Sequence, residues 1–428
     1  MNTNYINNQN SVLLYLDTRE YPLERQAEIL AAKNQGYKLC IATPTPDKYQ
    51  GFNIDYLLEV NIANYQEAEQ QILDYVYDHK INITGIIAWK DREVILASIL
   101  GKALSLPHTP VEVVENVRNK VKTRLLLDRF QGINPDYAVV TNEEQFMLAI
   151  NKIGVPCVLK QAGNSGGRGM RNIDTLDSAL TIYKQFIISN KAQASEMYHY
   201  FNEASLLEKK IFGTEHSVNG VVANGEVITL GIIDKKIDHV ISLQYENIVP
   251  SSLDLEVRKK VISIANEVIK ALKLNWCGFH IDFMVTENNE IKILEVGGRL
   301  GGEMINAYLI PLAQPGINPY EILIEVVQGR LPLLEKDYTE KFVSKAASRV
   351  IISPKTGIIS SVEGIEKVFC NSYCRYFFQR YGIGDEMVGA DVKFKNQEIG
   401  YIIAQCNNSE DIEKIVLNLV NKIKLIVQ

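Results

Sequence analysis

Residues 278–302 read GFHIDFMVTENNEIKILEVGGRLGG, and we interpret this stretch as a β-hairpin. A two-residue turn centred on residues 288–289 is expected, because asparagine tolerates the positive φ of tight hairpin turns. In that register Asp282 faces Glu295 on one side of the hairpin. Apolar pairs meet on the other side, Phe283 with Leu294 and Ile281 with Val296.

The opposed carboxylates of Asp282 and Glu295 require a positive charge between them. Two carboxylates about 5 Å apart repel each other by roughly 3 kcal/mol at an effective dielectric constant near 20. Oxygen ligands suit a hard cation, and Mg²⁺ takes one or two carboxylates and completes its shell with water and substrate phosphates. The hairpin therefore predicts a magnesium site, and a solvated acidic hairpin is the alternative.

A glycine-rich loop lies upstream, within residues 155–173, which read VPCVLKQAGNSGGRGMRNI. An apolar strand ends in Lys160, the loop covers residues 163–169, and a return strand begins at Met170. Glycines let backbone N–H groups cradle phosphate oxygens, and the lysine supplies a mobile positive charge. The loop is neither a Walker A sequence nor a dinucleotide fingerprint. It predicts a hairpin lid over phosphates, with a plain flexible hairpin tip as the alternative.

Two glutamates mark the segment between these motifs. A strand is predicted over residues 206–211, followed by a turn and by further strands that break at residues 224–225. Glu208 and Glu215 lie where an apolar strand meets a turn, and there a carboxylate can accept a hydrogen bond from an adenine amino group or a ribose hydroxyl. Solvated turn residues are the alternative interpretation.

The order of these motifs resembles the ATP-grasp superfamily over residues 119–302, through residues 119–120, 156–160 with the glycine loop, 207–215, 282 and 295–299. The resemblance implies a nucleotide held between two α+β subdomains, with ATP and Mg²⁺ as cofactors and Asp282 and Glu295 as the metal ligands. It implies that the nucleotide contacts Lys120, Lys160, Gly163, Ser165, Gly166, Gly167, Gly169, Glu208, Lys209, Ile211 and Glu215.

One departure from the family pattern concerns the metal shell. The usual signature is Glu-x-Asn-x-Arg, whereas Gly297 occupies the asparagine position here and cannot ligate. Water or substrate would then complete the shell, so one metal ion is better supported than two. Glu-x-x-x-Arg followed by Leu-Gly-Gly is similar to the ATP-grasp amino-acid ligases, which join an amino acid to an amine.

The resemblance to amino-acid ligases also implies substrate contacts. Arg299 is expected to be catalytic together with Lys160, holding the substrate carboxylate and later the oxyanion through its bidentate fork. A structural salt bridge is the alternative for Arg299. His280 shares the Asp282 side of the hairpin, and a hydrogen-bonded wall residue is equally consistent. The candidate substrate residues are Glu246, His280, Gly297, Arg299 and Gly301.

Length and composition bound the fold and the partners. The chain has 428 residues, a net charge of −6 and six scattered cysteines, which predicts several domains, reduced thiols and no nucleic-acid partner. An N-terminus without an apolar signal core, and the lack of an 18-residue apolar run, predict a cytoplasmic protein without a membrane partner.

The expected fold class is α/β and α+β in three parts. Residues 1–110 alternate strand and helix patterns and predict a parallel α/β domain, and residues 111–332 would hold the two-subdomain ATP-grasp fold. A helix over residues 116–130 is expected to carry Lys120. Residues 333–428 are expected to form a mostly β, α+β lid domain that ends in a helix over residues 409–427.

These features predict an ATP-dependent carboxylate–amine ligase that forms an amide or peptide bond through an acyl phosphate and releases ADP and phosphate. The expected substrates are a small carboxylate and an amine, both amino acids, and a homodimer is left open. Two alternatives are another ATP-grasp ligase of the nucleotide-precursor or carboxylase type, and a nucleotide sensor without turnover. The sequence names neither the acid nor the amine.

Overall fold

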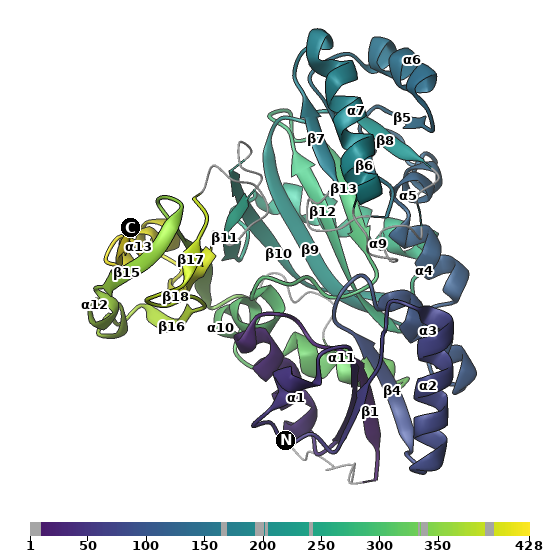
Figure 1. Cartoon of the computed structure of the whole chain (residues 1–428), viewed down its shortest axis with the longest axis vertical. Coiled ribbons are helices and arrows are strands. Elements are labelled where there is room, and N and C mark those ends of the chain that lie inside the picture. The colour runs from purple at the N-terminus through teal and green to yellow at the C-terminus, as the bar shows by residue number, and fades with distance from the viewer. Residues whose placement is uncertain are drawn as a thin grey trace.

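The structure is a computed structural model, and several stretches of the chain are outside its description. It describes residues 10–163, 169–192, 201, 204–238, 243–332, 334, 341–389 and 398–428. Within these residues no helix is long and apolar enough to cross a membrane. The described chain combines one parallel sheet with antiparallel sheets and helices, which confirms the predicted α/β and α+β class (Figure 1).

The N-terminal region is a four-stranded parallel sheet in the order β3-β2-β1-β4. Its first strand is buried at every position, as expected for a parallel strand covered on both faces. The strands are β1 (Val12–Leu16), β2 (Lys38–Thr43), β3 (Tyr56–Glu59) and β4 (Ile83–Ala88). The helices are α1 (Pro22–Asn34), α2 (Tyr65–Asp78) and α3 (Val94–Ala103), with a short 3₁₀ helix at Pro46–Tyr49.

A smaller antiparallel sheet in the order β5-β8-β6-β7 contains the strands on either side of the glycine-rich loop. Residues 157–161 and 170–173 pair as the predicted strand–loop–strand hairpin. The strands are β5 (Tyr137–Val140), β6 (Cys157–Gln161), β7 (Met170–Ile173) and β8 (Ser205–Lys209), and apolar side chains join the sheet to α6 (Glu143–Ile153) and α7 (Leu176–Ala192).

The predicted helix over residues 116–130 is wrong as a single element. The chain forms α4 (Val111–Arg118) and α5 (Lys120–Leu127), and Asn119 separates them. The Asn119 side chain accepts hydrogen bonds from the N–H groups of Val121 and Lys122, so it is the N-cap of α5. Lys120 is therefore the first residue of a helix and not a residue within one.

The largest sheet is antiparallel, in the order β13-β12-β9-β10-β11-β14-β18-β16. Its helix α9 (Leu255–Leu272) packs one apolar side against β9 and β10. The strands are β9 (Thr214–Ala223), β10 (Glu226–Asp238), β11 (Leu243–Val249), β12 (Cys277–Val285), β13 (Ile291–Gly297), β14 (Ser344–Ile352), β16 (Cys374–Gln379) and β18 (Glu398–Asn407). Strands from the C-terminal region thus extend the central sheet.

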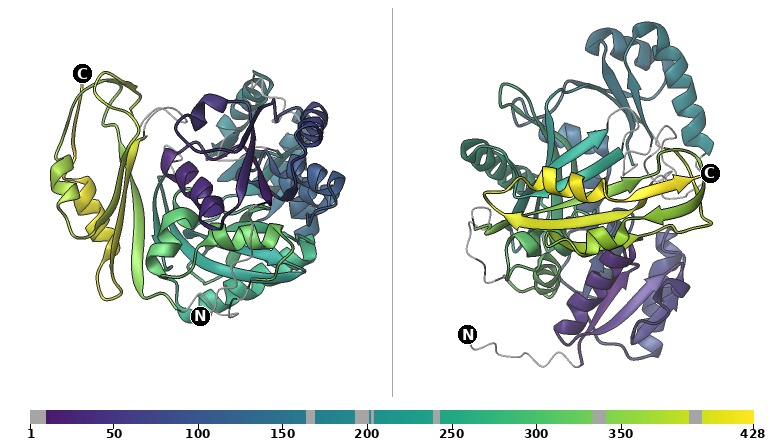
Figure 2. Two further views of the ribbon diagram at one scale, coloured as in Figure 1. Left: turned by 90° about the horizontal axis from the view of Figure 1, so that it is seen from below. Right: turned by 90° about the vertical axis from the view of Figure 1, so that its left-hand side faces the viewer.

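The C-terminal region also holds a small sheet in the order β17-β15-β19, and it lies to one side of the molecule in Figure 2. Its elements are β15 (Gly357–Glu363), α12 (Ile365–Phe369), β17 (Glu386–Met387), α13 (Ile412–Val420) and β19 (Lys424–Val427). The predicted final helix over residues 409–427 is wrong in its second half, because the last residues pair with β15. The three-part division of the chain stays a prediction.

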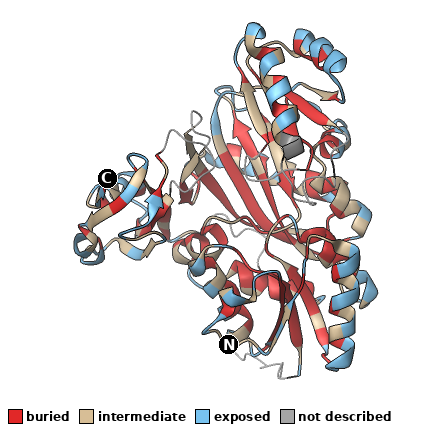
Figure 3. Cartoon of the chain, in the orientation of Figure 1, coloured by how far each residue is buried: buried red, intermediate tan, exposed pale blue. Residues whose placement is uncertain are grey.

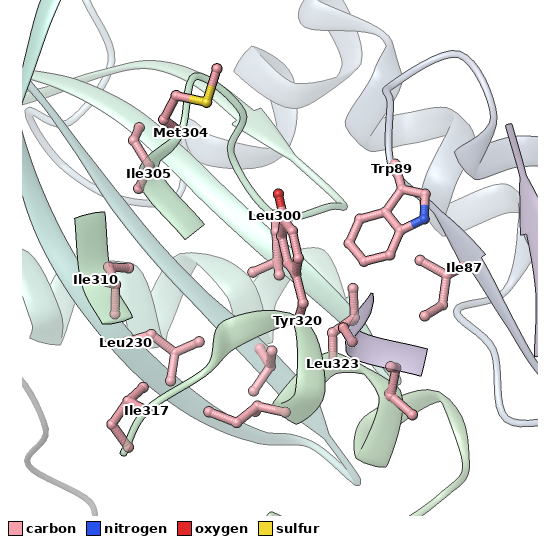
Figure 4. Close-up of a cluster of buried hydrophobic side chains, with 14 of the residues drawn as sticks. Ile87, Trp89, Leu230, Leu300, Met304, Ile305, Ile310, Ile317, Tyr320 and Leu323 are labelled. Carbon is pink, nitrogen blue, oxygen red and sulfur yellow. The ribbon is translucent and has the colours of Figure 1, made fainter. Parts of the chain in front are cut away.

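One large apolar core joins the parallel sheet to the central sheet. It packs Trp89 after β4 against Tyr320 on α11 (Pro319–Val327), with ring centroids 4.6 Å apart (Figure 4). A π-helix (Ile305–Leu309) and α10 (Ile310–Ala313) add further buried side chains. Figure 3 shows the strands buried and the outer helix faces exposed. The segment that follows the acidic hairpin therefore lies against the core.

Candidate functional site

The hairpin of β12 and β13 opposes Asp282 and Glu295, as predicted. The predicted turn at residues 288–289 is wrong, because the connection covers residues 286–290 and the Thr286 N–H donates to the Glu290 carbonyl over 3.0 Å. Near this loop Phe283 therefore pairs with Ile293 and not with Leu294. A β-bulge after Asp282 restores the expected register, so that the pairs Asp282–Glu295 and Ile281–Val296 are confirmed.

Each of the two opposed carboxylates contacts its own lysine. Lys120 Nζ lies 2.8 Å from Glu295 Oε1, and Lys235 Nζ lies 3.0 Å from Asp282 Oδ2. Lys235 also lies 2.8 Å from Glu215 Oε1, and 9% of its side chain is exposed. Burial alone would lower the pKa of Lys235, but the charges of Asp282 and Glu215 outweigh it and raise that pKa. The predicted positive charge beside the carboxylates is thus supplied by lysines.

Sequence reasoning missed Lys235, and the reason is a second irregularity of register. Counting back from the turn at residues 224–225 places Lys235 opposite Thr214. A bulge between Thr229 and Gly231 shifts the ladder by one residue, so Lys235 faces Glu215. A single extra residue leaves no pattern in the sequence, although the charged run Asp234-Lys235-Lys236 directly after apolar strand residues was an available signal.

The acidic pair fits Mg²⁺ by the chemistry of its donors. Burial raises the pKa of Asp282, but the ammonium group of Lys235 outweighs it and holds that pKa below its ordinary value, so the carboxylate is charged. Among the described residues no group of three or more acidic, histidine or cysteine side chains is arranged for a metal. Two carboxylates suit Mg²⁺ that completes its shell with phosphate oxygens and water.

Glu208 is buried between two cations. Its carboxylate oxygens lie 2.5 Å from Arg124 Nε and 2.5 Å from Lys160 Nζ, and 2% of the side chain is exposed. Arg124 also donates to the carbonyl of the bulged Leu294 over 2.8 Å. The carboxylate that we expected at the adenine or ribose is therefore neutralised by protein side chains, and Arg124 is a site residue that sequence reasoning missed.

We expect the protein to lose stability in acid, because the ion pairs of Glu208 are lost when its carboxylate is protonated. Burial raises the pKa of Glu208, but Arg124 and Lys160 outweigh it and lower that pKa from 4.5 to about 2. The charged form therefore stabilises the fold above the ordinary pKa, by roughly 3 kcal/mol, and this contribution is lost as the pH falls through about 2. Glu208→Gln should flatten the dependence of Tm on pH between about 5 and 2.

Thermal unfolding at several pH values measures this effect, with Glu143→Gln as the control. Glu143 starts α6, and 52% of its side chain is exposed. The control should follow the wild-type curve. Parallel curves for Glu208→Gln and the wild type would show that Glu208 does not stabilise the fold through its charge.

The ends of the glycine-rich loop lie near the start of α5. The backbone N–H of Lys120 donates to the Ala162 carbonyl over 3.0 Å, and Arg118 donates to the Gly163 carbonyl over 2.8 Å. Gly169 has a φ of +68°, a conformation that favours glycine. The predicted contacts Ser165, Gly166 and Gly167 lie outside the described residues. The first end of the loop therefore lies beside Lys120, and the Gly169 carbonyl at its other end accepts a hydrogen bond from the Gln161 N–H over 3.2 Å.

The segment that would meet the adenine connects the two antiparallel sheets. β8 ends at Lys209 and β9 begins at Thr214, so Ile211 lies between the sheets. The backbone N–H of Lys209 donates to the Asp136 carbonyl over 2.8 Å, and its ammonium donates to the Val155 carbonyl over 3.3 Å. The nucleotide roles of Lys209, Ile211 and Glu215 stay predictions.

Arg299 forms an ion pair with Asp91, which follows β4 of the parallel sheet. Its other terminal nitrogen, Nη1, donates to the Leu300 carbonyl over 2.9 Å, whereas the buried Nε has no hydrogen-bond partner among the described residues. The salt bridge that we considered as the alternative is thus present. Burial raises the pKa of Asp91, but Arg299 and Arg118 outweigh it and hold that pKa well below its ordinary value. Asp91 was not recognised from the sequence.

Gly297 makes room for His280, which lies directly opposite it in the ladder. A Cβ atom at position 297 would lie 2.0 Å from Cε1 of the imidazole, so a side chain there would displace the ring. His280 Nδ1 lies 3.2 Å from the Arg299 carbonyl, which can only accept, so Nδ1 carries the proton. Burial and the charge of Arg299 lower the pKa of His280 and favour the neutral ring.

The remaining two predicted substrate residues have structural partners. Glu246 on β11 is buried and forms an ion pair with Arg349 on β14, which places it at the junction with the C-terminal strands. The Gly301 N–H donates to Asn219 Oδ1 over 2.9 Å, and a Cβ at position 301 would lie 2.4 Å from that oxygen. Their substrate roles stay predictions.

Comparison with known proteins supports the ATP-grasp fold. A family model described as an ATP-grasp domain matches residues 153–307, which confirms the resemblance drawn from the motifs. Alanine–anticapsin ligase of Bacillus subtilis is 24% identical over 262 residues, which are 56% of this chain and 53% of that protein. D-alanine–D-alanine ligase of Saccharophagus degradans is 25% identical over 240 residues, 53% of this chain and 70% of that protein.

The structural comparison extends over the whole chain. The crystal structure of L-amino acid ligase from Bacillus licheniformis has a TM-score of 0.85 at 18% identity, and the match covers 98% of this chain and 99% of that one. The chain spans about half the length of the alanine–anticapsin ligases that it matches. Likeness at this level of identity establishes the fold.

Proposed function

Because residues 153–307 of this chain form an ATP-grasp domain, we propose that the protein is an ATP-dependent carboxylate–amine ligase that joins amino acids and releases ADP and phosphate. The observation on which this rests is the opposed pair Asp282 and Glu295, with Lys120 and Lys235 in contact with it. Carboxylates for a phosphate-bound Mg²⁺ and lysines for the phosphates are the groups that phosphoryl transfer requires. The relatives that act on alanine support amino acids as the substrates.

The proposed reaction starts from a carboxylate, which is a poor electrophile because an attacking amine would have to expel oxide. The substrate carboxylate therefore attacks the γ-phosphate of ATP, which gives an acyl phosphate and ADP. The amine then adds to the acyl carbon and phosphate leaves from the tetrahedral intermediate. Mg²⁺ would neutralise phosphate oxygens beside Asp282 and Glu295.

The chain's own residues supply position and charge. Lys160 and Lys120 would neutralise part of the negative charge of the phosphates. To do so, Lys160 would leave its present contact with Glu208, and Lys120 its contact with Glu295. Arg299, held by Asp91, would orient the substrate carboxylate and then stabilise the oxyanion. A closed glycine-rich loop would exclude the water that hydrolyses an acyl phosphate.

ADP release across the common amino acids, singly and in pairs, with mass detection of products, tests the proposed function. With the correct acid alone the enzyme should release phosphate slowly, and hydroxylamine should trap that acid as a hydroxamate. A nucleotide sensor without turnover would release no ADP with any acid. ADP release without any hydroxamate would remove the acyl-phosphate route.

We expect Arg299→Lys to lower kcat about 100-fold, as for the loss of one oxyanion donor, while ATP binding changes little. Lysine keeps the charge but loses the planar fork that now contacts Asp91 and the Leu300 carbonyl. Steady-state kinetics and ATP titration separate the two effects. Arg330→Lys is the matched control, because Arg330 likewise makes two hydrogen bonds with Glu325 through its fork. A collapse of ATP affinity at unchanged kcat would make Arg299 a nucleotide-binding residue.

A further inference from the structure

Glu303 and Met304 are consecutive residues in a conformation that non-glycine residues rarely adopt. Their φ angles are +58° and +67°, and the π-helix Ile305–Leu309 follows directly. Each such residue is strained and persists only where the surrounding structure fixes it, often at a ligand site. Short π-helices likewise occur at functional sites. The segment after the acidic hairpin is therefore held in a conformation that its sequence does not favour.

The core fixes the backbone on both sides of Glu303. The Met304 side chain is fully buried and belongs to the apolar cluster drawn in Figure 4. Its backbone N–H donates to Glu24 Oε1 over 3.2 Å. Asn306 donates to Asn219 Oδ1 over 3.0 Å and to the Gly301 carbonyl over 2.8 Å. With Gly301 and Met304 held in place, the backbone sets the direction of the Glu303 side chain.

The Glu303 carboxylate accepts one hydrogen bond and forms no ion pair with a described residue. Asn247 Nδ2 lies 3.3 Å from Oε2, and no lysine or arginine of the described chain lies within 4.0 Å of the carboxylate. The side chain is only half-buried, so a ligand can reach it. Burial raises the pKa of Glu303 to about 7, although Lys235 opposes that shift. A positively charged ligand group would relieve this cost of burial.

Glu303 lies close to the metal-site carboxylates through two neighbouring strands. Asn247, which contacts it, pairs across the sheet with Lys235, and Lys235 forms the ion pair with Asp282. Lys235 is already paired with two carboxylates, those of Asp282 and Glu215. Together with Glu303 these negative charges would repel a further anion. A carboxylate or phosphate group of a ligand is thereby disfavoured at this position, and a cationic group is favoured.

We propose that Glu303, oriented by Asn247, binds the ammonium group of an amino-acid substrate. The inference rests on the proposed ligase function and deepens it, because it names the charged group by which the substrate is recognised. The ammonium can belong to the amino acid that is phosphorylated, or to the amino acid that attacks. In the second case it passes one proton to the Glu303 carboxylate, and the free amine then adds to the acyl carbon. A charge-assisted hydrogen bond from nitrogen to the carboxylate supplies the recognition in both cases.

The test is Glu303→Gln, which keeps the shape of the side chain and removes its charge. The acceptor arm compares the best amino-acid acceptor from the ADP-release panel with hydroxylamine, which is uncharged at pH 7.5. The donor arm compares the best amino-acid donor with its analogue lacking the amino group, such as propionate for alanine. In one arm KM for the ammonium-bearing compound should rise at least about 30-fold, while KM for its uncharged counterpart stays the same.

Three further measurements keep the test decisive. Glu303→Asp retains the charge and should restore part of the affinity, and the Tm of each variant verifies folding. Glu398→Gln is the matched control, because this nearby carboxylate already accepts hydrogen bonds from Tyr21 over 2.5 Å and from Tyr401 over 2.8 Å. Its KM values should equal those of the wild type. The proposal would be overturned if KM changed equally for charged and uncharged compounds in both arms, or did not change in either arm. A wild-type protein that releases no ADP would overturn the ligase function instead.

Discussion

Glu295→Gln is expected to reduce ADP release at least about 100-fold while the protein stays folded. The amide keeps the size of the side chain but loses the negative charge that opposes Asp282 and contacts Lys120. A hard cation bound with nucleotide phosphates would then have one anionic protein ligand and not two. Turnover at increasing Mg²⁺ concentration, with calorimetric titration of Mg²⁺ and ADP, measures both activity and metal affinity.

The control for this variant lies on the same hairpin. Glu290 is exposed at the end of the connecting loop, so Glu290→Gln should leave turnover and metal affinity unchanged. Near-normal activity of Glu295→Gln at saturating Mg²⁺ would remove Glu295 from the metal site.

Arg19→Met is expected to lower the free energy of unfolding by about 3–5 kcal/mol, the usual cost of removing one partner of a buried ion pair. Arg19 is 5% exposed and lies 2.9 Å from Glu28, which is fully buried. It also donates to the Tyr320 hydroxyl over 2.6 Å and to the Leu300 carbonyl over 2.7 Å, so it joins the parallel sheet to the segment after the hairpin.

Chemical denaturation at neutral pH, followed by circular dichroism, measures the loss. Arg129→Met serves as the control, because Arg129 is exposed and its change should stay within about 0.5 kcal/mol. A loss for Arg19→Met as small as that of the control would mean that the buried pair contributes no net stability.

Local patterns in the sequence were sufficient for the hairpins and for the acidic pair. An asparagine-rich connection and apolar strands placed Asp282 opposite Glu295, although the predicted two-residue turn is a longer connection over residues 286–290. The register survived because a bulge at Leu294 compensated the longer loop. The same kind of irregularity hid Lys235, since a bulge adds one residue without changing composition or periodicity.

Contacts between distant segments could not be predicted from periodicity. Asp91 reaches Arg299 from the end of a parallel strand 208 residues earlier, and Arg124 reaches Glu208 from a helix 84 residues earlier. These pairings depend on how separate sheets are packed together, which alternation of side chains does not encode. The break at Asn119 was available in principle, because asparagine is a strong N-cap residue.

The continuity of the central sheet bears on the solubility of shortened forms of this chain. β11 pairs with β14 at four register positions, from Glu246 with Arg349 to Val249 with Ala346. A chain truncated after residue 332 would leave β11 as an uncovered sheet edge, with unpaired N–H and C=O groups that recruit strands of other molecules. The C-terminal strands therefore protect the central sheet against aggregation, and expression of the chain without residues 333–428 calls for a capped or charged edge at β11.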